Sequence, residues 1–257
     1  GVVLYRNATG SMFRSIDGGN VFAPVAQALT PTPVCEFAFA ALPSTRIYGV
    51  ECETGRVLRS EDDGATWSVA STIDEPRIGS PAVDATSADR LYVMTSHGTL
   101  LSEDGAATFA WMPRATGAPG DGRLLYFDAT TNARRWLSRD QNGAPSILRT
   151  IDDGATWVQV DDEHRLLASS RTRANTIFAS RYVDGSGDRN FSVSTDGGET
   201  WTVKFQFADR FANLGPLAYG QGTGEIFVYG VRGSSSGVTA RSVFYSNDDA
   251  ETFTERF

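Results

Sequence analysis

Four arginines stand in the same local setting, each within two residues after an acid at the end of a polar connection. A guanidinium group suits carboxylate or phosphate because its planar fork matches two oxygens at once. If the four side chains converge, they would form a site for an anionic ligand. The alternative is that each arginine pairs with its neighbouring acid on an exposed rim, which contributes little stability. The pairs are Glu75 and Arg77, Asp121 and Arg123, Glu163 and Arg165, and Asp209 and Arg210.

Other reactive chemistry is sparse in this sequence. The two histidines, His97 and His164, are far apart, and no His or Cys spacing typical of zinc occurs. Asp184 and Asp188 lie among glycines in the loop 183–190 and offer the oxygens that calcium uses, although a plain turn is the simpler explanation. No nucleophile elbow or phosphate-binding glycine loop is present. We therefore predict no metal and no cofactor, and assign no catalytic residue.

The two cysteines, Cys35 and Cys52, flank a stretch that reads as two strands around a short turn. If the turn is centred on Pro43 and Ser44, Cys35 lies opposite Cys52. That register permits a cross-strand disulfide in an oxidising compartment. The alternative is a pair of buried thiols.

Composition narrows the class of partner. The formal net charge is −8, which disfavours nucleic acid and anionic membranes because both bind basic surfaces. No run approaches the ~18 apolar residues of a membrane span, and residues 1–10 lack the features of a signal peptide. We expect a monomer, exported from a bacterium, without membrane insertion or nucleic-acid binding.

An eight-residue stretch recurs along the chain and organises it. It is clearest at 60–67 (SEDDGATW), and its six copies start 42 to 52 residues apart, the period of a propeller blade. The pattern that the copies share is Ser/Thr-x-Asp-x-Gly-x-Thr-Trp/Phe, and three of them depart from it at one position. Its acid can accept backbone hydrogen bonds in a tight turn, its glycine permits positive φ, and its aromatic ring is expected to lie buried beneath the turn. The acids are Asp17, Asp62, Asp104, Asp152, Asp196 and Asp248, and the aromatics are Phe22, Trp67, Phe109, Trp157, Trp201 and Phe253.

Two copies carry alanine in place of glycine, at Ala106 and Ala250. We expect those two turns to be looser or shifted by one residue. Between copies, the sequence repeats an apolar strand, a polar turn and a β-branched strand, followed by a short strand into the turn and another after it. This predicts an all-β, six-bladed β-propeller of four-stranded antiparallel blades, in a single domain over residues 1–257. Residues 1–22 match only the later strands of this unit, so either the first blade lacks its inner strand or an upstream segment supplies it.

The repeated motif resembles the Asp-box, or BNR repeat, of sialidases, VPS10-type sorting receptors and photosystem-assembly propellers. The resemblance rests on all six copies and spans the chain. It implies a propeller with the box at the turn between the third and fourth strands of each blade, facing away from the ligand-binding mouth. It implies no activity, because the box is scaffold in these families.

The sialidase pattern is incomplete in this chain. Sialidases use three arginines for the substrate carboxylate and a Tyr–Glu nucleophile pair. The nearest arginine phrase, EPRIGSP at 75–81, lacks the expected aromatic and proline, and Tyr126 and Tyr219 have no evident glutamate partner. We therefore expect a non-catalytic binding or scaffold propeller that contacts a protein or glycan through the face opposite the boxes. The alternatives are a sialidase-like glycoside hydrolase and a lectin that uses Arg77, Arg123, Arg165 and Arg210 for an acidic sugar.

Overall fold

The computed structural model of the chain contains β-strands and turns. The described residues include no helix long and apolar enough to cross a membrane. The structure describes residues 2–6, 12–17, 21–25, 34, 36–40, 43–51, 53–75, 78–84, 86–112, 124–131, 133–141, 144–183, 189–207, 213–219, 224–234 and 237–256.

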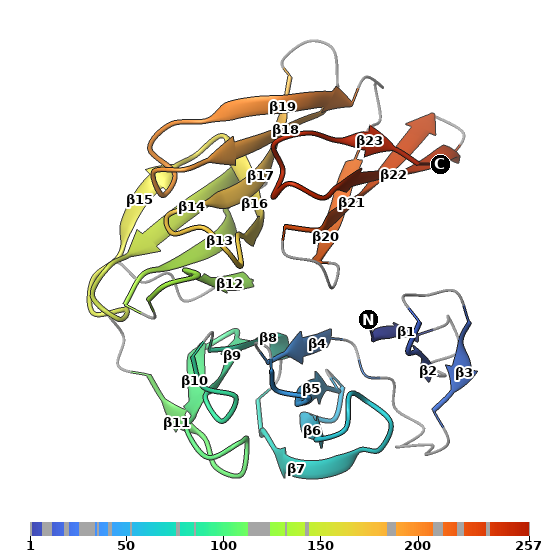
Figure 1. Cartoon of the computed structure of the whole chain (residues 1–257). Helices are drawn as coiled ribbons and strands as arrows, with labels where there is room; N and C mark the ends of the chain where they lie inside the picture. The colour runs from blue at the N-terminus through green and yellow to red at the C-terminus, as the bar shows by residue number, and fades with distance from the viewer. Residues whose placement is uncertain are drawn as a thin grey trace. The chain divides into compact units, whose positions relative to one another are not determined.

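The strands form six sheets, and in each sheet the strands pair in chain order as an antiparallel meander (Figure 1). Five sheets have four strands and the first has three. The first sheet contains β1 (Val3–Arg6), β2 (Met12–Ser15) and β3 (Ala23–Pro24). The next two contain β4 (Glu36–Phe39), β5 (Ile47–Val50), β6 (Arg56–Ser60) and β7 (Ser68–Thr72), then β8 (Ile78–Val83), β9 (Leu91–Thr95), β10 (Gly98–Ser102) and β11 (Ala110–Trp111).

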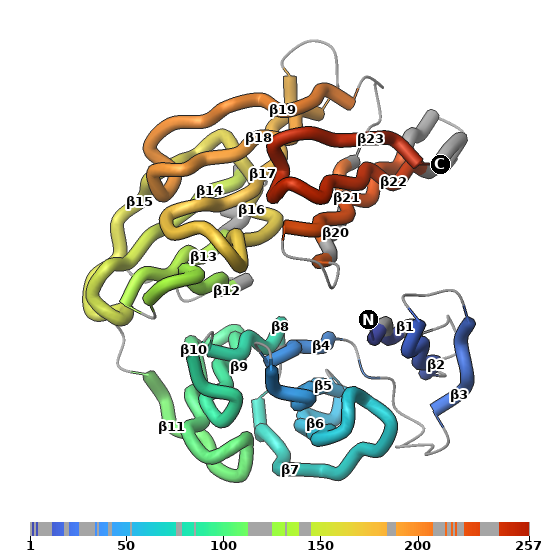
Figure 2. The backbone as a smooth tube through the Cα atoms, in the orientation of Figure 1, coloured from blue at the N-terminus to red at the C-terminus, as the bar shows by residue number. Residues whose placement is uncertain are grey.

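The remaining three sheets follow the same order, as the tube in Figure 2 traces. They contain β12 (Leu124–Phe127), β13 (Arg135–Gln141), β14 (Ala144–Thr150) and β15 (Val158–Asp161); β16 (His164–Ser169), β17 (Ile177–Tyr182), β18 (Arg189–Ser194) and β19 (Thr202–Phe207); and β20 (Asn213–Tyr219), β21 (Ile226–Ser234), β22 (Gly237–Ser246) and β23 (Thr254–Glu255).

The expectation of six four-stranded blades is wrong. The fold is an all-β propeller type with five blades of four-stranded antiparallel sheet, and the N-terminal sheet has three strands among the described residues. The reason is local: β1 and β2 form a hairpin that leads directly into the first copy of the repeated turn. That copy is therefore preceded by two strands, where each other copy is preceded by three.

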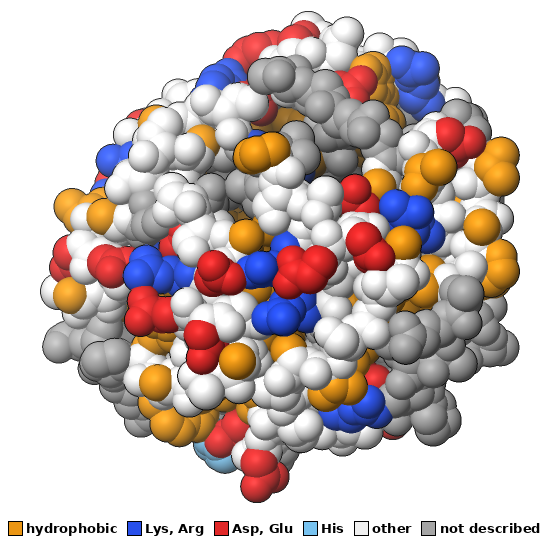
Figure 3. Space-filling view, turned by 60° about the horizontal axis from the view of Figure 1, so that its bottom comes forward, with side chains coloured by type: hydrophobic (Ala, Val, Ile, Leu, Met, Phe, Trp, Pro, Cys, Tyr) orange, Lys and Arg blue, Asp and Glu red, His pale blue; other side chains and the backbone are white. Residues whose placement is uncertain are grey.

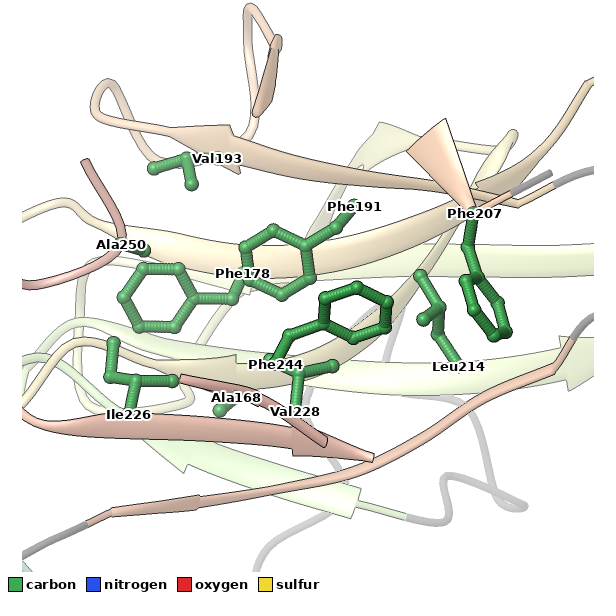
Figure 4. Packing of buried hydrophobic residues seen from close by; sticks show 10 residues of the cluster. All are labelled: Ala168, Phe178, Phe191, Val193, Phe207, Leu214, Ile226, Val228, Phe244 and Ala250. Atoms are coloured by element: carbon green, nitrogen blue, oxygen red, sulfur yellow. The ribbon is translucent and has the colours of Figure 1, made fainter. Parts of the chain in front are cut away.

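The chain divides into two compact units, residues 1–125 and 126–257, with the boundary inside β12. The core of the first unit includes Tyr48, Val50, Leu91 and Val93, all below 1% exposed. In the second unit, the layer between sheets β16–β19 and β20–β23 is rich in phenylalanine, as Figure 4 shows. Phe205 stacks on Phe244 with ring centroids 4.5 Å apart. Burial of each such ring stabilises the fold by about 1.5–3 kcal/mol, so these layers hold neighbouring sheets together.

The repeated turn joins the last two strands of its sheet and has the same hydrogen bonds in every copy that is fully described. At 60–67, Ser60 Oγ donates to Asp62 Oδ1 at 2.8 Å, Thr66 N donates to the same oxygen at 2.8 Å, and Thr66 Oγ1 donates to Asp62 Oδ2 at 2.7 Å. Asp17 makes the described part of this pattern, with Ser15 Oγ and Val21 N. The full pattern recurs at Asp104, Asp152, Asp196 and Asp248.

The copies with alanine keep this geometry. Ala106 N donates to Ser102 Oγ at 2.9 Å, as Gly64 N does to Ser60 Oγ at 2.8 Å. Ala106 and Ala250 both adopt φ of 70°, in the left-handed region. The expectation of looser or shifted turns is therefore wrong, because the surrounding hydrogen bonds hold alanine in a conformation that glycine adopts more readily.

Burial of the aromatic residues is uneven. Trp67 is 4% exposed and its Nε1 donates to Gly64 O at 3.0 Å. Phe22, in contrast, is 40% exposed. Phe109, Trp157, Trp201 and Phe253 are partly buried.

In the five four-stranded sheets, the repeated turn lies at the same end as the turn between the first and second strands. Asp63 N, within the repeated turn, donates to Thr45 O at 2.9 Å. The equivalent bonds join Gly105 to Asp89, Asp153 to Ala133, Gly197 to Asn175 and Asp249 to Gly224. The opposite end of these five sheets is therefore formed by the turn between strands two and three and by the connections between successive sheets.

Candidate functional site

The end of sheet β16–β19 opposite the repeated turn carries a cluster of arginines. Arg165 is exposed at the start of β16 and lies opposite Ser180 on β17. Two residues further on, Tyr182 pairs with Arg189 of β18. Alternate residues of a strand share a face, and so do opposed residues of paired strands, which places Arg165, Tyr182 and Arg189 on one face of the sheet.

Arg189 is held against an aromatic ring. Its Cζ lies 3.1 Å from the centroid of Tyr182, which is 54% exposed. The pKa of Arg189 is lowered, chiefly by burial. The contact with Tyr182 opposes this change, and the positive charge of Arg165 adds to it. Arg165 and Arg189 are thus like charges on one face of the sheet, and an anion bound on this face would be attracted by both.

Glu163, the acid two residues before Arg165, forms its ion pair with a different arginine. Glu163 Oε2 forms an ion pair with Arg181 Nη2 at 2.8 Å, and both side chains are exposed. Arg181 pairs in register with His164, so it lies on the other face of the sheet from Arg165. Within the described part of the chain, Arg165 has no ion pair, and its neighbouring acid does not neutralise it.

The other arginines named from the sequence, Arg77, Arg123 and Arg210, lie outside the described residues. So do Asp184 and Asp188 of the suggested calcium loop, and Cys35 and Cys52. The strands beside the cysteines pair Glu36 with Val50 and Phe39 with Ile47. The expected register would have set Glu36 opposite Glu51, so that register is wrong by one residue.

The two histidines have different surroundings. His97 is exposed in the turn between β9 and β10, and its Nδ1 lies 2.7 Å from Glu75 Oε2. His164 is 4% exposed, its Nδ1 lies 3.0 Å from Asp161 Oδ2, and its ring stacks on Trp201 with centroids 4.3 Å apart. His164 is thus a packed core residue that fixes the connection into β16. Across the described ranges, no three His, Cys, Asp or Glu side chains gather as metal ligands.

The two inner-strand tyrosines use their hydroxyls inside the second unit. Tyr126 Oη donates to Leu167 O at 2.7 Å, and Tyr219 Oη donates to Ser169 O. Burial raises the pKa of Tyr219 above its ordinary value. In this structure both phenols are hydrogen-bonded to backbone carbonyls of β16.

Arg189, Tyr182 and Arg181 were missed in the sequence. They come from β17 and β18, on either side of residues 183–188, and not from the connections that precede inner strands. The signal was the run SRYVDGSGDRNF, which carries arginines on both sides of a glycine-rich turn. In the view of Figure 3, acidic and basic side chains are interleaved with uncharged ones, with no broad patch of one sign.

No protein-family model matches the chain, and no curated protein matches its sequence. Solved structures resemble it in fold. A GH74 enzyme of Niastella koreensis is 18% identical with a TM-score of 0.69, over 99% of this chain and 43% of that enzyme. The chain thus spans less than half the length of that glycoside hydrolase.

Two further structures are similar over nearly the whole chain. YCF48 bound to a D1 peptide is 17% identical with a TM-score of 0.60, over 99% of this chain and 78% of YCF48. The nidogen–laminin complex contains a chain that is 11% identical with a TM-score of 0.66, over 98% of this chain and 91% of the other. At these identities, the likeness establishes a β-propeller fold and nothing finer.

Proposed function

We propose that the chain is a non-catalytic binding module that holds a protein or glycan partner at the sheet ends opposite the repeated turns. The partner's contact group is anionic. The observation that carries this proposal is the placement of Arg165 and Arg189 on one face of sheet β16–β19, on a chain whose net charge is −8. A local positive site on an acidic protein selects for an anionic group because it both attracts and orients it.

The sheet ends that carry the repeated turns support the same assignment, because the acids there bond within the protein. There, the acids of the repeated turns are bonded to their own turns, as Asp152 is to Thr150 and Thr156. This is the behaviour of a scaffold, and we propose that the six turns are Asp-boxes. Two of the similar structures, with a D1 peptide and with laminin, are complexes with a partner, which also favours a binding role.

Titration calorimetry tests the proposal. The probes are sialic acid, an oligogalacturonate and an acidic peptide, each at low and high salt. We expect at least one to bind, more weakly at high salt, since salt screens exposed charges. Arg165→Ala should lower the affinity about tenfold, the usual scale for losing a charged hydrogen bond. Arg181→Ala, which alters the other face, is the matched control. Absence of binding by the wild type, or equal binding by Arg165→Ala, contradicts the proposal.

A glycoside hydrolase is the second candidate, favoured by the likeness to the GH74 enzyme. It requires two reacting groups within several ångströms of each other. Fluorogenic sialosides and a reducing-end assay on neutral polysaccharides test it directly. Turnover by the purified chain would replace the non-catalytic assignment.

We also propose that the protein acts outside the cytoplasm as a monomer, as its composition suggests. Light scattering at several concentrations tests the monomer, and fractionation of the producing cell tests the export.

A further inference from the structure

The repeated turns contain Asp–Gly steps, the dipeptide in which an aspartate readily rearranges to isoaspartate. In that reaction the glycine nitrogen bonds to Cγ of the protonated aspartic acid, and the nitrogen's proton leaves with the acid's hydroxyl as water. Hydrolysis of the resulting succinimide restores the water and gives aspartate or isoaspartate. Glycine favours the reaction because it has no side chain to hinder the approach. The steps for which the structure describes both residues are Asp63–Gly64, Asp104–Gly105, Asp153–Gly154 and Asp196–Gly197.

The fold requires glycine in these steps. Gly64 and Gly105 adopt φ of 82° and 72°, in the left-handed region. A Cβ added to Gly64 would lie 2.9 Å from Leu4 Cδ2, and one added to Gly105 would lie 2.8 Å from Arg59 Nη1. A larger residue would hinder the rearrangement, but it would be strained here. Protection of these steps therefore has to come from other groups.

Two of the glycine nitrogens donate to the hydroxyl at the first position of their own turn. Gly64 N donates to Ser60 Oγ at 2.8 Å. Gly154 N donates to Thr150 Oγ1 at 3.0 Å. Ser60 and Thr150 are both 1% exposed, so water has little access to either bond. The nitrogen has to give up its proton to react, and here it must first break a buried hydrogen bond.

The other two glycine nitrogens donate to a backbone carbonyl of the turn between the first two strands of the same sheet. Gly105 N donates to Asp89 O at 2.9 Å, and Gly197 N donates to Asn175 O at 2.8 Å. The nucleophile of the rearrangement is therefore held in all four steps, by a side chain in two and by the backbone in two.

The carboxyl group is also held at Asp104. Hydrogen bonds from the side chain and backbone of Thr108 lower the pKa of Asp104 from 3.8 to about 2. The rearrangement consumes the protonated acid, which is scarcer at neutral pH when the pKa is lower. Both reacting groups of this step are thus restrained by the turn.

We propose that the repeated turns protect their own Asp–Gly steps from rearrangement to isoaspartate by holding each glycine N–H in a hydrogen bond. This role is independent of the anionic partner proposed for Arg165 and Arg189. Isoaspartate places an extra carbon in the backbone, which would displace the bonds that close the turn. Rearrangement at a step therefore requires that its turn opens first, and its rate reports that local opening.

Mass spectrometry of the intact chain, digested after incubation at neutral pH, tests the proposal. Electron-based fragmentation distinguishes isoaspartate from aspartate at each step. We expect all four steps to rearrange at least about tenfold more slowly in the native chain than in the chain unfolded in urea, because folded turns open rarely. Native steps that rearrange as fast as unfolded ones would overturn the proposal.

Ser60→Ala removes the acceptor of one glycine and leaves the other three in place. It should speed the rearrangement at Asp63 about two- to tenfold, the scale of one lost hydrogen bond. The rate at Asp153 in the same molecules is the internal control and should not change. Ser60→Thr keeps the hydroxyl that Thr150 supplies at the equivalent position, and it should react like the wild type. An unchanged rate at Asp63 in Ser60→Ala, or an equal increase at all four steps, would reject the local role of the hydroxyl.

Discussion

Arg59 Nη1 donates a 2.8 Å hydrogen bond to the carbonyl oxygen of Gly105, which lies in the repeated turn of the next sheet. The carbonyl at this place in the turn accepts from a guanidinium group in five copies. The other four bonds are Arg14 Nε to Asp63 O, Arg135 Nη1 to Asp153 O, Arg149 Nη1 to Gly197 O and Arg173 Nη2 to Asp249 O. An arginine thus completes each of these turns, and all but Arg135 reach it from the preceding sheet.

Arg59→Met keeps most of the apolar stem and removes the donor. We expect it to lower the free energy of unfolding by about 1–2 kcal/mol, because the carbonyl of Gly105 loses a charged hydrogen-bond partner. Urea titration measures this. Since Arg59 also pairs with Glu61 at 3.0 Å, Glu61→Gln is the control and should cost less than about 1 kcal/mol. If both variants lose the same stability, the surface ion pair explains the loss and the inter-sheet bond does not.

Acid should destabilise the fold through the repeated turns. Hydrogen bonds from the side chain and backbone of Thr156 lower the pKa of Asp152 from 3.8 to about 2. The pKa values of Asp62, Asp104, Asp196 and Asp248 are also lowered to about 2. A carboxyl whose folded pKa is depressed contributes stability that is present above its unfolded pKa and is lost as the pH falls through the folded pKa.

Stability should therefore be level above about pH 5 and fall progressively from about pH 4 toward pH 2. Urea midpoints measured at half-unit intervals of pH follow this. Thr156→Val removes one of the donors and should move the acid transition to higher pH. A wild-type midpoint that is constant down to pH 2 would contradict the role given to these acids.

The tryptophans of the repeated turns differ in burial, so replacing them by alanine should lower the free energy of unfolding by different amounts. Trp67→Ala should cost about 3–5 kcal/mol, since it empties a buried site beside Phe37, whose ring centroid lies 5.8 Å from that of Trp67. Trp157→Ala should cost less, because that ring is only partly buried. Arg165→Ala, on an exposed edge, should cost less than about 1 kcal/mol. Denaturant titration of the three variants gives the order, and equal losses for Trp67→Ala and Arg165→Ala would mean that Trp67 is not in the core.

The repeated turns could be predicted from sequence because their chemistry is local. Asp62 bonds to residues two before and four after it, so all of its partners lie within one short stretch. The arginine–carbonyl bonds were predictable only in part. Arg14, Arg59 and Arg149 stand directly before Ser15, Ser60 and Thr150, a regularity visible in the sequence. Arg135, in β13, and Arg173, between β16 and β17, do not stand before a repeated turn, so no regular spacing in the sequence predicts their bonds.

The number of four-stranded blades could be predicted only in part, and the arginine cluster could not. Counting repeated turns gives six, and only the strand pattern of residues 1–22 indicated that the first blade lacks its inner strand, as the three-stranded first sheet has it. Arg165 was noted beside Glu163, whereas the sheet places it on one face with Arg189, on a strand two places away. Pairing between strands, and not proximity in sequence, decides which charges meet.

Tyr219→Phe separates a structural role from a catalytic one. The hydroxyl of Tyr219 donates to Ser169 O, and Arg171 Cζ lies 4.1 Å from the centroid of its ring. Removing the hydroxyl deletes this hydrogen bond, which should cost about 0.5–1.5 kcal/mol in a urea titration. Tyr182→Phe, at an exposed ring, is the matched control and should change stability by less than about 0.5 kcal/mol, as for most surface substitutions. If the chain hydrolyses any glycoside, Tyr219→Phe should leave the turnover number unchanged at a temperature where it is folded. Loss of turnover with an intact fold would instead indicate a catalytic role for Tyr219. Because burial raises its pKa, Tyr219 would then need an adjacent base to act as a nucleophile.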